Sequence, residues 1–86
     1  MKNTNSMYTN LENTTKAWKN LMNHFDQEYY HSLNDYDAMN FYKNEYDNAF
    51  ENYKNNRNKL VKINLINLKN GLITLDEFQT FMNEVY

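Results

Sequence analysis

The sequence predicts an all-α protein: a small antiparallel bundle of three helices, or four if the long central helix breaks. One observation is the stretch 36–71, which carries apolar side chains at steps of three and four and has neither proline nor glycine before its last residue. Such spacing places one apolar face along an α-helix. A second is the chain's fourteen aromatic residues, which argue against disorder. The stripe consists of Met39, Tyr42, Tyr46, Ala49, Tyr53, Leu60 and Ile63.

Length and composition limit the possible classes of protein. Eighty-six residues make one domain near the lower size limit for a self-sufficient core, so dimerisation or partner binding would help its stability. Without cysteine, the chain has no disulfide and no thiolate metal site, as is typical of a reducing cytoplasm. Neither a signal peptide nor a membrane-spanning run is evident. We therefore expect a cytoplasmic protein, or one exported by a route that leaves no such mark in the sequence.

The first helix is expected over residues 10–32, within a single helical domain of residues 9–86 that follows a flexible N-terminus of residues 1–8. Thr9 and Glu12 have the spacing of a capping box, in which side chains satisfy the first backbone N–H groups of a helix. The predicted apolar face consists of Leu11, Trp18, Leu21, Met22, Phe25 and Tyr29.

The central helix is expected over residues 35–70, with Asn34 or Asp35 as its N-cap. Trp18 is the expected anchor of the first helix against it, because an indole ring buries a large area. The apolar stripe lapses at residues 55–58, which leaves open a break there. Continuity is favoured because no residue in that stretch breaks a helix. One polar residue, Asn56, interrupts the stripe, and the sequence leaves open whether it lies in a helix–helix seam.

The C-terminal part has the clearest local signals. Gly71 is the only glycine and stands where a left-handed helix cap is expected. Thr74 and Glu77 then form a second capping box, which predicts a last helix over residues 75–85. Its expected buried face consists of Leu75, Phe78, Phe81, Met82 and Val85.

Residues 60–86 resemble a short C-terminal domain of the SHOCT type, in which a helix is followed by Gly-Leu-Ile-Thr and by a helix that opens with acidic residues and Phe. The resemblance implies a helical hairpin used for oligomerisation or docking, and no enzyme activity. The same segment differs from a calcium-binding EF-hand loop, because Ile66 and Leu68 replace its first and third oxygen ligands. The matching residues are Gly71, Leu72, Ile73, Thr74, Asp76, Glu77 and Phe78.

The chain shows no catalytic motif, and we predict neither an enzyme nor a cofactor or metal. His24, Glu28 and His31 follow one another at helical spacing and would suit zinc, but they also fit partly exposed residues beside the apolar face. Neither serine lies in a strained turn, and a single glycine makes no phosphate-binding loop.

Charge and one aromatic residue predict the binding surface. Residues 26–53 carry seven acids and one lysine, a net charge of −6, while residues 54–69 carry five cations and no acid, a net +5. This sorting fits either mutually neutralising segments or an acidic face that binds a basic partner. Phe41 falls on the polar side of the central helix, as a binding hot spot would, although it would also suit cover by the C-terminal hairpin or a dimer partner. The predicted partner-binding residues are Asp37, Phe41, Glu45, Asp47, Asn48 and Glu51.

In size and composition the chain resembles small inhibitors from phages and mobile elements, including anti-CRISPR proteins. Eighteen asparagines are typical of an AT-rich genome. The resemblance implies a non-enzymatic protein that blocks a host protein, such as a nucleic-acid-processing effector. The alternatives are a homo-oligomeric adaptor module, homodimeric for example, and a bacteriocin-type immunity protein. Direct nucleic-acid binding through residues 54–69 is disfavoured because the chain is acidic overall.

Overall fold

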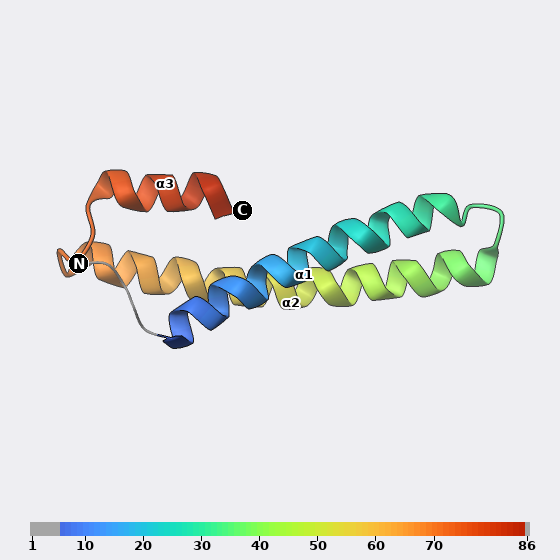
Figure 1. The fold of residues 1–86 in the computed structure, drawn as a ribbon, viewed down its shortest axis with the longest axis horizontal. Coiled ribbons are helices and arrows are strands. Elements are labelled where there is room, and N and C mark those ends of the chain that lie inside the picture. The colour runs from blue at the N-terminus through green and yellow to red at the C-terminus, as the bar shows by residue number, and fades with distance from the viewer. Residues whose placement is uncertain (1–5, 86) are drawn as a thin grey trace.

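The computed structural model describes residues 6–85 and the side chains of residues 6–83. The described chain is helical, without a strand, which confirms the predicted all-α class and the number of helices. None of the helices in this part of the chain is long and apolar enough to cross a membrane. The helices, drawn in Figure 1, are α1 (Ser6–His31), α2 (Tyr36–Lys69) and α3 (Leu75–Val85).

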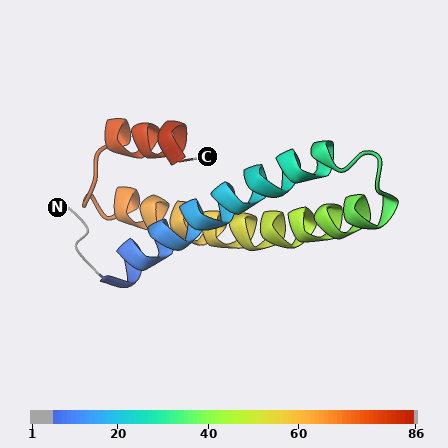
Figure 2. The same cartoon turned by 45° about the vertical axis from the view of Figure 1, so that its right-hand side comes forward.

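The molecule is elongated rather than compact. After α1 the chain reverses direction, and α2 runs back past α1 so that the two helices cross (Figures 1 and 2). The last helix, α3, lies along the C-terminal part of α2. Within the described residues, α2 contacts both neighbours, whereas α1 and α3 make no close backbone approach to each other. The radius of gyration is 16.3 Å, compared with about 12 Å for a compact domain of this length. The three helices therefore do not enclose one shared core.

The first helix begins earlier than predicted. α1 starts at Ser6, so Thr9 lies inside the helix and the predicted cap at that position is wrong. The first turns of α1 also contact α2: Asn64 of α2 donates a hydrogen bond of 2.8 Å from Nδ2 to the Tyr8 hydroxyl. Burial raises the pKa of that hydroxyl. Of the segment predicted to be flexible, residues 6–8 are helical and residues 1–5 lie outside the described residues.

The turn between α1 and α2 is closed by local hydrogen bonds. Asp35 donates its backbone N–H to the Ser32 carbonyl at 2.9 Å. Its carboxylate accepts the N–H of Ala38 at 3.1 Å, which identifies Asp35 as the N-cap of α2. α2 then runs unbroken through residues 55–58, as continuity predicted. Tyr53 and Leu60, buried on either side of this stretch, hold the helix where the apolar stripe lapses.

Gly71 ends α2 as predicted. Its φ of +75° is in the left-handed region, which a side chain would strain. Leu72 N–H donates to the Asn67 carbonyl at 2.8 Å, and Gly71 N–H donates to the Leu68 carbonyl at 3.1 Å. This pair of bonds is the Schellman motif, and it satisfies carbonyls that the end of the helix leaves without a partner.

The predicted capping box at the start of α3 is confirmed. Thr74 N–H donates to Glu77 Oε1 at 2.9 Å, and Glu77 N–H donates to Thr74 Oγ1 at 3.1 Å. Hydrogen bonds from the backbone and side chain of Thr74 lower the pKa of the Glu77 carboxyl. The box thus favours the ionised carboxylate.

Acidification is therefore expected to loosen the start of α3. The pKa of Glu77 is lower in the folded chain than in the unfolded chain. Its contribution to the stability of the folded state is therefore complete above the unfolded pKa, and it is lost as the pH falls through the folded pKa. The amide resonance of Thr74, followed by NMR during an acid titration, should report this loss. In Glu77→Gln, which keeps the box without a titrating group, the transition should vanish. A transition that persists in this variant would show that another group causes it.

The core is small. Five described residues are buried: Thr15, Ala49, Tyr53, Leu60 and Asn64. Trp18, the predicted anchor of α1, is half-buried, so its ring is covered only in part. The fully buried α1 residue is Thr15, whose Oγ1 donates to the Leu11 carbonyl at 2.6 Å. A short side chain is completely covered where two helices lie close together, while a large ring extends beyond the contact.

Candidate functional site

The hairpin concentrates acidic residues at one end of the molecule. Residues 26–53 comprise the end of α1, the turn and the first half of α2, which lie together at the closed end of the hairpin (Figure 1). With seven acids and one lysine, this acidic end carries a net charge of −6. The neighbouring segment 54–69 of α2 carries five cations and no acid, a net +5. Charge is therefore separated along the long axis.

Phe41 is an exposed ring within the acidic end that contacts the neighbouring Tyr42. Its side chain is 56% exposed. The ring meets Tyr42 edge to face, with centroids 5.2 Å apart, and Tyr42 lies 6.4 Å from Phe25 of α1. The row Phe25–Tyr42–Phe41 thus crosses from one helix to the other. A ring that is already ordered loses little entropy when a partner covers it.

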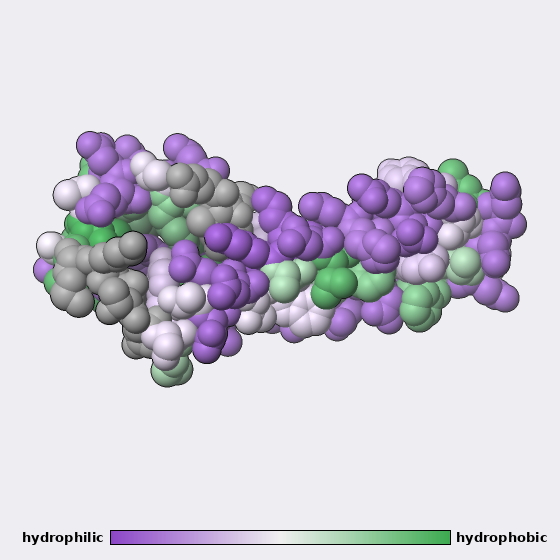
Figure 3. Space-filling model, viewed as in Figure 1, coloured by the Kyte–Doolittle hydropathy of each residue, from purple (hydrophilic) through white to green (hydrophobic). Residues whose placement is uncertain are grey.

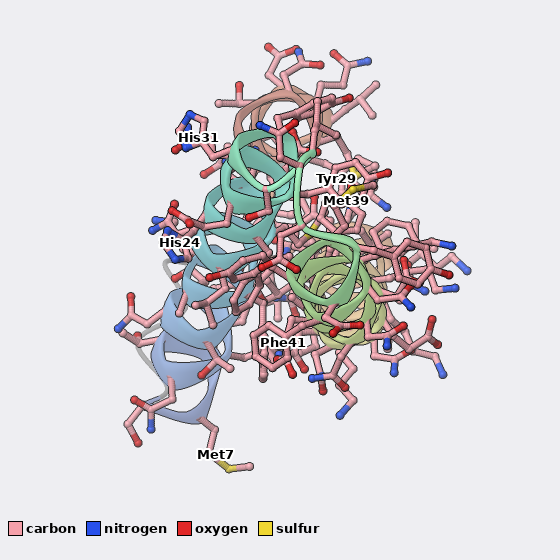
Figure 4. The ribbon with its side chains drawn as sticks, turned by 90° about the vertical axis from the view of Figure 1, so that its right-hand side faces the viewer. Met7, His24, Tyr29, His31, Met39 and Phe41 are labelled. Carbon is pink, nitrogen blue, oxygen red and sulfur yellow. The ribbon has the colours of Figure 1, made fainter. Side chains whose placement is uncertain are left out.

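Four of the six predicted site residues share a face with this ring. Steps of four, four and three positions place them on one side of α2. Glu45 is half-buried and the other three are exposed. Figure 4 shows Phe41 on the underside of the hairpin, beside the junction of α1 and α2. We call these residues the Phe41 face: Asp37, Phe41, Glu45 and Asn48.

The other two predicted residues lie elsewhere on α2. Asp47 lines an open pocket of about 230 Å³ between α1 and α2. Tyr29, which also lines it, lies on the opposite side of the hairpin from Phe41 (Figure 4). Glu51 pairs with Lys54 at 3.4 Å, and both side chains are exposed. The six residues therefore do not form one surface, because six positions of helix place Asp47 about 120° around the helix axis from Phe41.

The pocket offers little chemistry. Its lining places one lysine among two carboxylates and two phenols, and its volume is below the roughly 300 Å³ at which small-molecule sites begin. It contains no serine, cysteine or histidine that would act as a nucleophile or base. The lining residues are Asp26, Tyr29, Lys43, Tyr46 and Asp47.

The histidines of α1 do not form a metal centre in the structure. Within residues 6–85 there is no group of three or more His, Cys, Asp or Glu side chains placed to hold a metal ion. His24 and His31 lie on the side of α1 that faces away from α2 (Figure 4). Glu28, predicted to accompany them, is half-buried.

Two features went unrecognised in the sequence. Phe50 stacks on Tyr46, with centroids 6.5 Å apart and planes at 5°, and Lys54 Nζ lies 5.8 Å from the centre of the Phe50 ring. The spacing of these residues by four positions was the available signal. The second feature is the buried polar residue of α2, which is Asn64, while Asn56 is half-buried. Its distant partner on α1 gave no local signal.

Among the described residues, eleven large hydrophobic side chains are exposed, including Phe41, Phe50 and Ile66. Figure 3 shows apolar side chains as small separate areas within a mainly hydrophilic face. Comparison of the chain with protein-family models, curated proteins and solved structures finds no match. Function is therefore argued from the Phe41 face and from the distribution of charge.

Proposed function

We propose that this chain is a non-enzymatic protein-binding inhibitor that covers a basic surface of its partner with the Phe41 face. The observation that carries the proposal is the 56% exposed Phe41 ring, in contact with Tyr42 within the acidic end. Large exposed rings cost solvation free energy, and aromatic side chains supply many of the strongest contacts at protein interfaces. The antiparallel return of α2 along α1 is the architecture that carries this face.

The acidic charge around the Phe41 ring indicates that the partner has a basic surface. Asp37 and Glu45 flank Phe41 on the same face, and the acidic end as a whole carries −6. Such a field attracts a basic surface and speeds encounter with it at low salt. Basic surfaces on proteins commonly hold DNA or RNA, so occupancy by this chain would exclude nucleic acid. An anti-CRISPR-type protein encoded by a phage or mobile element fits this mode of inhibition.

The test compares two phenylalanines of one helix. Phe41 and Phe50 are both exposed, at 56% and 42%. Nine positions separate them, which places them on opposite sides of α2. Wild type, Phe41→Ala and Phe50→Ala would each be immobilised and incubated with a nuclease-treated lysate of the source organism or its host. Bound proteins would be quantified by mass spectrometry.

We expect a protein with a nucleic-acid-binding surface to be retained by wild type and by Phe50→Ala. Loss of a hot-spot ring costs 2 kcal/mol or more, so Phe41→Ala should retain it roughly thirty-fold less well. Glu45→Lys should weaken retention too, and added DNA or RNA should compete. If no captured protein distinguishes Phe41→Ala from Phe50→Ala, the Phe41 face is not the binding surface.

A further inference from the structure

We propose that a second copy of the chain covers the Phe41 face in the free protein, through antiparallel pairing of the two α2 helices. The dimer would use the same face as the proposed function. Only the expected competition between the second copy and the basic partner protein rests on that function. The dimer itself is argued from the spacing, exposure and charge of side chains on α2.

A continuous seam runs along α2 beside its contact with α1. Its members follow one another at alternating steps of four and three, the spacing of facing positions in paired helices, and six of the eight are polar or charged rather than apolar. Six members are exposed, and Glu45 and Asn52 are half-buried, so α1 and α3 leave most of the seam accessible. The seam consists of Phe41, Glu45, Asn48, Asn52, Asn55, Lys59, Lys62 and Ile66.

The seam is complementary to its own reverse. In the proposed dimer the two α2 helices run antiparallel, and the two-fold axis passes between residues 53 and 54. Each residue then faces the residue of the second copy whose number, added to its own, gives 107. Every seam position then meets another seam position, because the spacing is the same from either end. A two-fold axis repeats each contact twice, so a favourable pair counts double. The facing pairs are Phe41 with Ile66, Glu45 with Lys62, Asn48 with Lys59, and Asn52 with Asn55.

The chemistry of these pairs favours the antiparallel arrangement. Phe41 and Ile66, which are 56% and 50% exposed, would cover each other at both ends. Glu45 would face Lys62 of the second copy, and residues 38–53, with a net charge of −2, would lie on residues 54–69, with a net charge of +5. A parallel pair would instead place Glu45 on Glu45 and Lys62 on Lys62. Facing charges of this kind set partner orientation in paired helices.

The small core makes such a partner favourable. Five buried residues and a radius of gyration of 16.3 Å leave most apolar side chains of the described chain partly in water. Chains of this size commonly gain the missing stability by association. Because the dimer would bury Phe41 and Glu45, a basic partner protein would have to displace the second copy.

The test uses a charge swap, followed by sedimentation equilibrium of the full chain from micromolar to millimolar concentration. Wild type should be a dimer in reversible equilibrium with monomer, weakened by salt. Glu45→Lys and Lys62→Glu each place like charges opposite one another twice, so each should raise the dimer Kd roughly ten-fold or more. The double variant, Glu45→Lys with Lys62→Glu, restores the facing charges and should recover most of the wild-type affinity.

The matched control is Asp47→Lys, which reverses an exposed acid outside the seam and should leave the dimer Kd nearly unchanged. Circular dichroism would verify that each variant keeps its helices. A wild type that stays monomeric throughout, or a double variant no better than either single variant, would overturn the pairing. Lys62→Glu leaves the Phe41 face intact, so it should still capture the partner protein. Capture of the partner by a wild type that stays monomeric would preserve the proposed function while excluding the dimer.

Discussion

Leu60→Ala is expected to lower the free energy of unfolding by about 3 kcal/mol, the middle of the range for truncating a buried leucine. Leu60 is fully buried in α2, and it is the largest side chain of the core with no exposed area. A chain of 86 residues has a total stability of roughly 4–13 kcal/mol. The substitution therefore removes a large share of it. Urea unfolding followed by circular dichroism at fixed temperature would measure the change.

The control for this experiment is Leu65→Ala, which removes the same atoms from the same helix at a position that is 38% exposed. Its expected cost is below about 1.5 kcal/mol, because part of the side chain is already in water and the cavity left behind is open to solvent. Equal losses at the two positions would mean that the small core around Leu60 is not what stabilises the hairpin.

Ala49→Leu is expected to be the other strongly destabilising change, with a cost of about 1–3 kcal/mol from overpacking. Ala49 has no exposed area, so the added carbons have no solvent to extend into. The helices would have to move apart or the new side chain would have to leave its preferred rotamer. Thermal unfolding gives the loss of stability, and Trp18 fluorescence reports movement of α1 relative to α2.

Ala17→Leu is the matched control on α1, where the position is exposed. Alanine and leucine have similar helix propensities, so this change should stay within about 0.5 kcal/mol of wild type. If Ala49→Leu were as harmless as Ala17→Leu, the close contact of α1 with α2 at Ala49 would be wrong.

The helices and most of their ends could be read from the residues because the signals are local. Asp35 caps a helix through the N–H three positions later, and Thr74 and Glu77 cap one another across the same short distance. Gly71 takes a backbone conformation that other residues avoid. Continuity through residues 55–58 likewise followed from the absence of any helix-breaking residue there.

The candidate site was only partly predictable. The exposure of Phe41 and its position among acids followed from helical spacing, and the structure agrees with both. The same spacing, applied more strictly, would have separated Asp47 from Phe41. That Asp47 instead lines a pocket with Asp26 and Tyr29 depends on how α1 lies against α2, which no local pattern specifies.

The sequence was sufficient for three helices, for the caps at Asp35, Gly71 and Thr74, and for an acidic stretch, because each depends on residues within one or two turns of each other. The position of α1 on α2 depends on contacts between distant residues. The bond from Asn64 to Tyr8 spans 56 positions, and it joins α2 to the first part of α1, where local patterns predicted a later start of the helix. Burial of Thr15 rather than Trp18 has the same origin, since only the crossing of two helices selects which side chain loses its contact with water.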